Sequence, residues 1–363
     1  MIKLDGSYLE GGGQIVRTAL ALSVITGKSF SITDIRKARK EPGLKPQHLI
    51  AAKFAKELCD ADVVGLEIGS HALDFYPKKT HIKNLNIDIG TAGSITLLMQ
   101  TILYPCLFGN KIVSVKAKGG TDVSWSPSID YFREVLLPQV KRYAEITFFL
   151  EKRGFYPQGG GSIKLRIRPK YHISDYSTFD DFYTDLNRLG PKIDLTSKGK
   201  LIEIRGISYA SKNLMNASVA ERQAKSAKYF LNKVDAPIKI RIEHCDTLST
   251  GSGITLYAVF STNEDKDYLN PVIIGADNLG EKGKKSELVG EEAAKKLLNS
   301  FVGNFCVDEN MVDQILPLMA LFSDSKITIP SVSLHAKANI YVIEAFLPVK
   351  FIIQDNLIEC VRK

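Results

Sequence analysis

The sequence lacks any apolar run that approaches the roughly 20 residues needed to span a bilayer, so no membrane partner is expected. It also shows no signal-peptide pattern at its start, because residues 1–5 alternate as a strand does. Cysteine is scarce, and the five cysteines are far apart and mostly in apolar stretches: Cys59, Cys106, Cys245, Cys306 and Cys360. Such cysteines are typical of reduced core positions rather than of disulfides or zinc ligands. These absences predict a cytoplasmic protein.

Positive charge is concentrated in one part of the chain. The formal net charge is +8, and residues 28–56 hold eight Lys or Arg residues against two acids. This segment indicates either a polyanionic partner or a solvated basic face. Aromatic residues interleave it poorly, so a nucleic-acid partner would be held by phosphate contacts, which weaken as salt rises, rather than by base stacking.

Segments in which apolar residues alternate, as in strands, and segments in which they recur with a helical period follow one another along the chain. This order favours a layered α/β (α+β) fold. Two successive units are predicted, both in the order strand, helix, strand, helix, strand, strand. The first comprises strand 1–5, helix 12–27, strand 29–36, helix 46–59 and strands 62–69 and 73–76. The second comprises strand 84–89, helix 92–107, strand 111–117, helix 126–144 and strands 145–152 and 162–168. The units share element order and little sequence.

The rest of the chain predicts an interruption of this pattern. Residues 169–200 are polar and aromatic with few periodic features, which indicates a long surface excursion. The elements expected after it are strand 201–204, helix 216–232, strands 237–244, 253–261 and 271–276, helix 286–301, helix 309–322, strand 326–330, helix 334–347 and strand 349–354. Single cores stop growing at roughly 250–300 residues. We therefore predict a large domain of residues 1–184 and 307–363, interrupted by a small α/β domain of residues 185–306.

Two segments that lead from a strand into a helix carry groups suited to anions. Residues 10–14 contain three consecutive glycines, which allow backbone amides to approach an anion at the positive end of a helix; a tight turn explains them equally. Residues 36–48 gather arginine and lysine before another helix, an arrangement that suits phosphate. The alternative is a solvated basic loop in which His48 is a hydrogen-bonding group at the helix start.

The histidines predict no zinc site. Four of the six form no metal-ligand spacing with one another or with cysteine: His71, His81, His172 and His244. His335 differs, because residues 331–340 carry it from a strand end into a helix, where active-site side chains often project. A structural role for this histidine remains the alternative.

Six ordered motifs resemble those of RNA 3′-terminal phosphate cyclases: residues 4–6, residues 10–14 with Arg17, residues 36–48, residues 119–122, residues 154–161 and residues 335–339. They span the large domain nearly end to end, whereas the match within the inserted segment rests mainly on residues 219–222. The resemblance implies a large domain of repeated βαβαββ units, like that of enolpyruvyl transferases, with a smaller α/β domain inserted.

The resemblance also implies an activity, that of an ATP-dependent ligase. His335 would take AMP from ATP and pass it to an RNA 3′-phosphate, after which the neighbouring 2′-hydroxyl would close a 2′,3′-cyclic phosphate. The implied partners are ATP, RNA with a 3′-terminal phosphate, and Mg²⁺ or Mn²⁺ bound by Glu10. The implied ATP-binding residues are Gln100, Pro127, Tyr131, Asn310, Met311, Val312, Asp313 and Gln314. The implied ligands of the triphosphate and the RNA end are Arg17, Arg36, Arg39, Gln47 and His48.

Three other functions stay open on the sequence alone. The first is a non-catalytic, cyclase-like factor of ribosome assembly, which would lack the catalytic histidine that His335 supplies here. The second is an enolpyruvyl-type transferase, whose small anionic substrate would need arginines but neither ATP nor a nucleophilic histidine. The third is a pure RNA-binding module based on residues 28–56. No self-association element is evident in the sequence.

Overall fold

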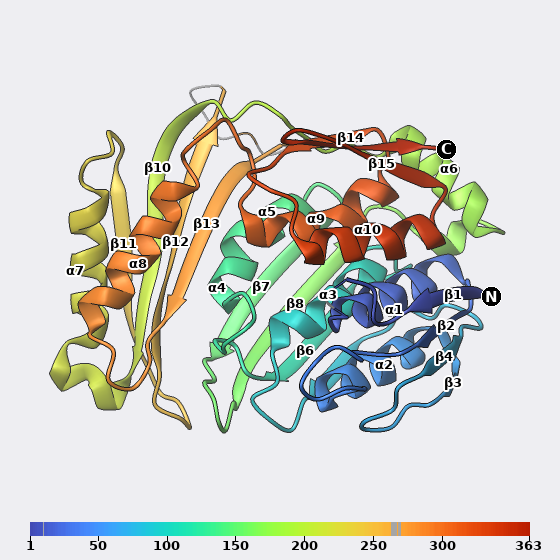
Figure 1. Cartoon of the computed structure of the whole chain (residues 1–363), viewed down its shortest axis with the longest axis horizontal. Coiled ribbons are helices and arrows are strands. Elements are labelled where there is room, and N and C mark those ends of the chain that lie inside the picture. Colours follow the sequence, from blue (N-terminus) through green and yellow to red (C-terminus); the bar gives the residue numbers. More distant parts are fainter. Residues whose placement is uncertain (10, 263–266, 268–269) are drawn as a thin grey trace.

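Three of the four sheets in the described part of the chain share one strand order. The computed structural model describes residues 1–9, 11–262, 267 and 270–363, and the mixed α/β class predicted from the sequence is confirmed. Figure 1 shows three of the sheets with their helices on one side of the molecule and a fourth, separate layer on the other. None of the described helices is long and apolar enough to cross a membrane.

The first two of these sheets belong to consecutive units. The first unit contains β1 (Ile2–Asp5), α1 (Gln14–Thr26), β2 (Phe30–Thr33), α2 (Pro46–Cys59), β3 (Asp62–Val64) and β4 (Leu73–Tyr76), in the sheet order β1-β2-β4-β3. The second contains β5 (Leu85–Asp88), α3 (Ile95–Cys106), β6 (Val113–Gly119), α4 (Ile129–Tyr131), α5 (Leu137–Val140), β7 (Ala144–Lys152) and β8 (Gly161–Pro169), in the order β5-β6-β8-β7. In each unit the first two strands are parallel and the last two form an antiparallel pair.

The third sheet repeats this order with strands far apart in sequence. It contains β9 (Asp194–Leu195), β14 (Ser325–Thr328), β15 (Val349–Gln354) and β16 (Leu357–Arg362), in the order β9-β14-β16-β15. β9 and β14 are parallel, and the helices that accompany this sheet are α9 (Glu309–Leu321) and α10 (Leu334–Phe346). The unit was not predicted, because β9 is two residues long and residues 196–308 separate it from α9.

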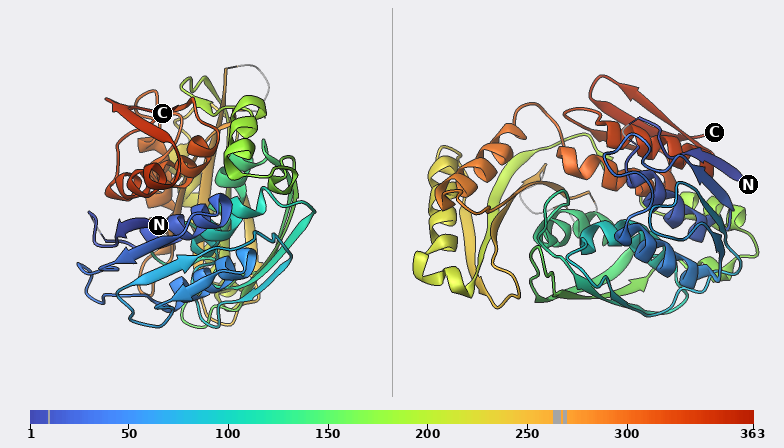
Figure 2. Two further views of the ribbon diagram at one scale, coloured as in Figure 1. Left: turned by 90° about the vertical axis from the view of Figure 1, so that its right-hand side faces the viewer. Right: turned by 60° about the horizontal axis from the view of Figure 1, so that its bottom comes forward.

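The separate layer interrupts the third unit. It contains β10 (Lys200–Ser211), α7 (Val219–Leu231), β11 (Ile238–Cys245), β12 (Ser252–Ser261), β13 (Val272–Leu279) and α8 (Ser286–Asn299), in the sheet order β11-β10-β12-β13. Figure 1 and the right-hand view in Figure 2 place α7 and α8 on the outer side of this sheet, with the two chain termini at the other end of the molecule. We call this element group the inserted layer.

The expectation of an irregular excursion over residues 169–200 is wrong, because α6 (Phe179–Leu189) forms there. Thr178 caps the helix by accepting a hydrogen bond from the Asp181 backbone N–H at 3.1 Å. Phe182, Tyr183 and Leu186 are buried, and Phe182 lies edge-on to Phe108 of the second unit with ring centroids 5.3 Å apart. The apolar side chains therefore follow a helical period that their polar neighbours obscured. The predicted domain boundary between 184 and 185 falls inside this helix.

Replacing Phe182 with alanine is expected to lower the free energy of unfolding by about 3–5 kcal/mol, because it leaves a cavity under α6. Leu189 lies on the same helix but is 58% exposed, so Leu189→Ala is expected to change stability by less than about 0.5 kcal/mol. Denaturant unfolding of the two variants measures the difference. Equal losses would mean that α6 is not packed as described.

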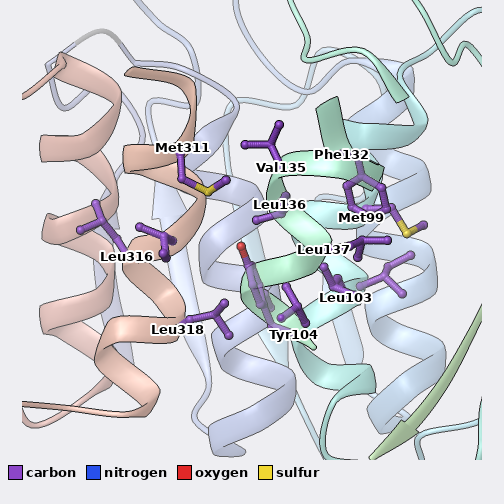
Figure 3. Packing of buried hydrophobic residues seen from close by; sticks show 14 of the residues in the cluster. Met99, Leu103, Tyr104, Phe132, Val135, Leu136, Leu137, Met311, Leu316 and Leu318 are labelled. Carbon is purple, nitrogen blue, oxygen red and sulfur yellow. The ribbon is translucent and has the colours of Figure 1, made fainter. Parts of the chain in front are cut away.

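Helix α1 is the centre of the three units and carries the site described below. All of its residues are buried, and it packs against α2, α3 and α10. Figure 3 shows the neighbouring core, in which buried side chains of α3, α5 and α9, among them Leu103, Leu137 and Leu318, fill the space between the helices. The first turns of α1, α2, α9 and α10, and not the sheets, line the cavity described below.

Candidate active site

The first turns of α1, α2, α9 and α10 face one cavity of about 550 Å³. The first backbone N–H groups of a helix have no partner within the helix, and they carry the positive end of its dipole. Four such ends around one cavity favour a polyanion. Eleven of the residues predicted for the site line it: Arg17, Arg36, Arg39, Gln47, His48, Gln100, Pro127, Asn310, Asp313, Gln314 and His335.

The glycine turn before α1 passes directly beside two imidazoles. A Cβ atom added to Gly13 would lie 2.1 Å from Nε2 of His48, so no side chain fits at this position. A Cβ atom added to Gly12 would lie 3.5 Å from Cε1 of His335 and 3.7 Å from Nη2 of Arg39. The glycines thus bring the backbone at the start of α1 into contact with both rings.

His48 is a neutral hydrogen-bond donor aimed at this turn. The ring is buried, and burial lowers its pKa to about 3, with the positive charges of Arg17 and Arg36 acting in the same direction. Its Nδ1 accepts a hydrogen bond from the Lys45 backbone N–H at 3.0 Å, so the single proton of the neutral ring lies on Nε2. Nε2 has no hydrogen-bond partner among the described residues. A buried donor of this kind suits an anion in the cavity.

Arg17 is held in place before any ligand binds. Its Nε donates to Oε1 of Gln100 at 2.8 Å, and its Nη2 donates to Oε1 of Gln14 at 2.6 Å. Burial lowers its pKa to about 10, and the carboxylate of Asp313 opposes that shift, so the guanidinium keeps its charge at neutral pH. A fixed guanidinium fork binds phosphate oxygens with little further loss of side-chain entropy.

Asp313 of α9 is the carboxylate whose charge acts on Arg17. Burial raises the pKa of Asp313 to about 7, and Arg17 opposes this rise. The carbonyl of Asp313 accepts a hydrogen bond from Nδ2 of Asn339 at 2.6 Å, and Oδ1 of Asn339 accepts one from Nε2 of Gln14 at 3.0 Å. Asn339 therefore connects α10, α9 and α1 beneath the cavity.

His335 is exposed to the cavity in the first turn of α10. Ser333 caps the helix, because its Oγ accepts a hydrogen bond from the Ala336 backbone N–H at 3.0 Å. The ring lies against Gly12, where the guanidinium of Arg39 also approaches. A ring sealed in the core and remote from the arginines would have excluded a nucleophilic role, and the observed position does not.

Four predicted site residues are not seen in the cavity wall. Tyr131 is buried and donates its hydroxyl hydrogen to Oδ1 of Asp308 at 2.6 Å, beneath the start of α9. Met311 and Val312 are buried in the core, on the side of α9 that turns away from the cavity. Glu10, the predicted metal ligand, lies outside the described residues. Within the described ranges, no group of three or more His, Cys, Asp or Glu side chains could hold a metal ion.

Sequence reasoning missed two residues that the inserted layer contributes. Asp277 of β13 and Lys296 of α8 line the cavity, and Nζ of Lys296 donates to the Asp277 carbonyl at 3.2 Å. Nothing local in the sequence marks them, because they occupy an ordinary strand end and an ordinary polar helix face. Trp125 was also missed, although the sequence signal was available: it is the one tryptophan of the chain and lies two residues before Pro127.

Two motifs that support the resemblance lie outside the cavity wall, at the junction with the inserted layer. These are residues 119–122 and 154–161. Beside them, the buried guanidinium of Arg153 forms ion pairs with Asp122 at 3.2 Å and with Glu243 of β11 at 2.8 Å. These motifs therefore connect the second unit to the inserted layer instead of contacting a ligand in the cavity.

Comparison with known proteins identifies relatives of one kind. The family model for the RNA 3′-terminal phosphate cyclase matches residues 8–353. A protein of Pyrococcus abyssi, named RNA 3′-terminal phosphate cyclase, is 40% identical over 348 residues, which cover 96% of this chain and 93% of that protein. Proteins of the same name from Methanosarcina mazei and Saccharolobus islandicus are each 41% identical, and the matches cover 98% and 96% of this chain and 97% and 95% of those proteins.

The match extends through the three units and the inserted layer, so it is not confined to the glycine and arginine segments around the cavity. The family inferred from the six motifs is confirmed. The chain belongs to the RNA 3′-terminal phosphate cyclase family.

Proposed function

We propose that this chain converts an RNA 3′-terminal phosphate into a 2′,3′-cyclic phosphate with ATP, and that His335 carries the adenylyl group. The observation that carries the proposal is the position of His335: an exposed imidazole lies against the glycine turn of α1, in a cavity surrounded by helix N-termini and guanidinium groups. A nucleophile must lie within reach of the phosphorus atom that it attacks. The helix N-termini and guanidinium groups would hold the negatively charged phosphates beside the ring and stabilise the charge that develops during the reaction.

In the first step a ring nitrogen of His335 attacks the α-phosphorus of ATP. A nitrogen–phosphorus bond forms, the bond from that phosphorus to the bridging oxygen breaks, and pyrophosphate leaves while the ring loses its proton. Neutral imidazole is a good nucleophile near pH 7. Arg17, Arg36, Arg39, Gln47 and His48 are the proposed ligands of the transferring phosphates and of the RNA end, since guanidinium groups and the Nε2–H of His48 can all donate to phosphate oxygens.

In the second step an oxygen of the RNA 3′-phosphate attacks the phosphorus of the histidine adenylate. The nitrogen–phosphorus bond breaks and the RNA end becomes adenylylated. In the third step the adjacent 2′-hydroxyl attacks the terminal phosphorus, loses its proton and releases AMP. This internal nucleophile needs only orientation, and effective molarities for such attack reach roughly 10⁵–10⁸ M.

The nucleoside of ATP is assigned to the part of the cavity that Gln100, Pro127, Asn310, Asp313 and Gln314 line. Met311 and Val312 of α9 would support this part from behind, as would Tyr131, which bonds to Asp308 at the start of that helix, because all three are buried. A divalent cation, Mg²⁺ or Mn²⁺, would neutralise phosphate charge when bound, with Glu10 as the proposed protein ligand. The described carboxylates do not form a metal cage of their own, which fits an ion carried mainly by the triphosphate.

We further propose that the three units form one large domain of the enolpyruvyl-transferase type with a small α/β domain inserted. Of the predicted bounds, residues 1–184 and 307–363 around residues 185–306, the first moves to a position after β9, because β9 belongs to the third sheet. Support comes from the common strand order of the three sheets and from the interruption of the third unit by the inserted layer. The five cysteines are all free, which fits a cytoplasmic location.

The test is the chemical form of an RNA end. An oligoribonucleotide with a 3′-phosphate is incubated with ATP and Mg²⁺, and the product is expected to resist phosphatase while AMP accumulates in equal amount. The matched control has a 2′-deoxy sugar at the last position, so it should stop at the adenylylated end. Turnover of a small anion without ATP would instead support an enolpyruvyl-type transferase, and RNA binding without any change at the end would support a binding module.

A further inference from the structure

Trp125 is the most exposed large apolar side chain among the described residues. Its side chain is 98% exposed, although tryptophan is usually well buried, and it is the one tryptophan of the chain. The ring therefore contributes no packing to the fold. An exposed indole beside a cavity can contact a bound ligand, because it offers a flat apolar face and one hydrogen-bond donor.

The backbone at Trp125 is strained. Its φ angle is 66°, in the left-handed region that a bulky residue rarely adopts. The surrounding loop maintains this conformation: Oγ of Ser126 donates to the Val123 carbonyl at 3.0 Å, and the Ser128 backbone N–H donates to Oδ2 of Asp277 at 2.7 Å. Glycine would remove the strain, so the structure holds a tryptophan where folding alone favours a smaller residue.

The loop places the indole at one side of the active-site cavity. Trp125 lines this cavity and also an adjoining cavity of about 360 Å³, located between its loop and the β13–α8 part of the inserted layer. The two cavities share Asp277 and Lys296 in addition to the loop. Only the first cavity is lined by Arg17, Arg36 and Arg39. The phosphate-binding groups and Trp125 thus belong to different sides of the first cavity.

This arrangement orients a bound nucleotide. If the phosphates lie against the glycine turn and the arginines, then the base extends toward the loop of Trp125 and Pro127. Of the described residues that line the cavity, Trp125 alone carries an indole or phenyl ring, and Asn310 at the start of α9 offers none. Bases stack well on aromatic rings, and purines, with the larger ring system, stack best.

We propose that Trp125 is the stacking platform for the adenine of ATP and that it positions the nucleotide with its α-phosphorus at His335. This inference rests on the proposed function, because it takes the triphosphate site as given. The terminal base of the RNA is the less suitable occupant. The basic loop that would guide the RNA backbone, residues 36–48, lies on the arginine side of the cavity and not on the Trp125 side.

Fluorescence tests contact directly, because the protein has a single tryptophan. The probe is α,β-methylene-ATP, which cannot release pyrophosphate, added to the full-length protein with Mg²⁺. Saturable quenching of the emission is expected, whereas a 3′-phosphorylated oligoribonucleotide alone should leave it unchanged. Quenching by the oligonucleotide but not by the nucleotide analogue would overturn the proposal in favour of RNA stacking, and no change with either would overturn it outright.

Substitutions test the effect on the reaction. Trp125→Ala is expected to raise the ATP concentration for half-maximal labelling of the protein about tenfold, with little change in the rate at saturating ATP. Trp125→Phe should restore most of the affinity. Trp125→Gly should lose affinity like the alanine variant while its Tm stays the same or rises, since the strain is gone; a structural role would lower Tm instead. Tyr229→Ala, at a 75% exposed aromatic on α7, is the matched control and should change nothing.

These outcomes separate the inference from the function beneath it. If the wild-type protein takes up label from ATP and Trp125→Ala does so with an unchanged dependence on ATP concentration, the stacking role is wrong and the proposed function stands. If the wild-type protein takes up no label although the analogue quenches Trp125, the nucleotide site is correct and the histidine chemistry is wrong.

Discussion

Replacing His335 with alanine is expected to abolish covalent labelling of the protein by α-labelled ATP and to reduce cyclisation by about 10⁴-fold or more. The imidazole is the only protein group that forms a bond to phosphorus in the proposed mechanism, and the methyl group of alanine cannot replace it. The label on the wild-type protein should be acid-labile and stable to base, as expected of a phosphoramidate. Gel analysis after ATP treatment with Mg²⁺ or Mn²⁺ measures both properties.

A control must show that the loss of labelling comes from the missing nucleophile and not from weaker binding of the nucleotide. His335→Ala keeps Trp125, so the quenching titration with α,β-methylene-ATP should give nearly the wild-type affinity. The matched control is His81→Ala, which changes an exposed histidine whose ring pairs with Asp60 at 3.3 Å, remote from the cavity wall. It should label fully. A base-stable label that persists in His335→Ala would assign the chemistry to another residue.

The helices of the site could be predicted from the sequence, since periodic apolar residues and start signals are local. Helix α2 begins at Pro46 and α10 at Leu334, both as predicted, and Ser333 caps α10. The third unit could not be predicted. Its first strand has two residues, and what identifies β9 as a strand is its parallel pairing with β14 far along the chain.

The chemical state of the site was also beyond local reasoning. His48 could be placed at a helix start, but its neutral form depends on burial and on cations from α1 and the loop before α2. Asp277 and Lys296 reach the cavity only because the inserted layer folds back against the loop of Trp125. Burial and electric field depend on the finished packing, and no short segment of sequence encodes them.

Replacing Gly13 with alanine is expected to reduce adenylylation and cyclisation by about 10²-fold or more, with the fold retained. Gly13 has φ −64° and ψ −7°, a helical conformation that alanine adopts without strain, so the backbone tolerates the change. The new methyl group, however, would lie 2.1 Å from Nε2 of His48 and 3.1 Å from Nη1 of Arg17. Hydrogen bonds to Gln100 and Gln14 hold Arg17, so the ring of His48 must move.

Gly12→Ala is the matched comparison, because a Cβ atom there lies at an ordinary contact distance of 3.5 Å from His335. Its activity should fall much less than that of Gly13→Ala, in single-turnover labelling with thermal unfolding as the check on folding. Adding His48→Ala to Gly13→Ala removes the clash together with the donor, so the double variant should be no worse than Gly13→Ala alone. Additive losses would show that the methyl group acts elsewhere than on this ring, and equal activities of the two glycine variants would show that the cavity does not have the described width.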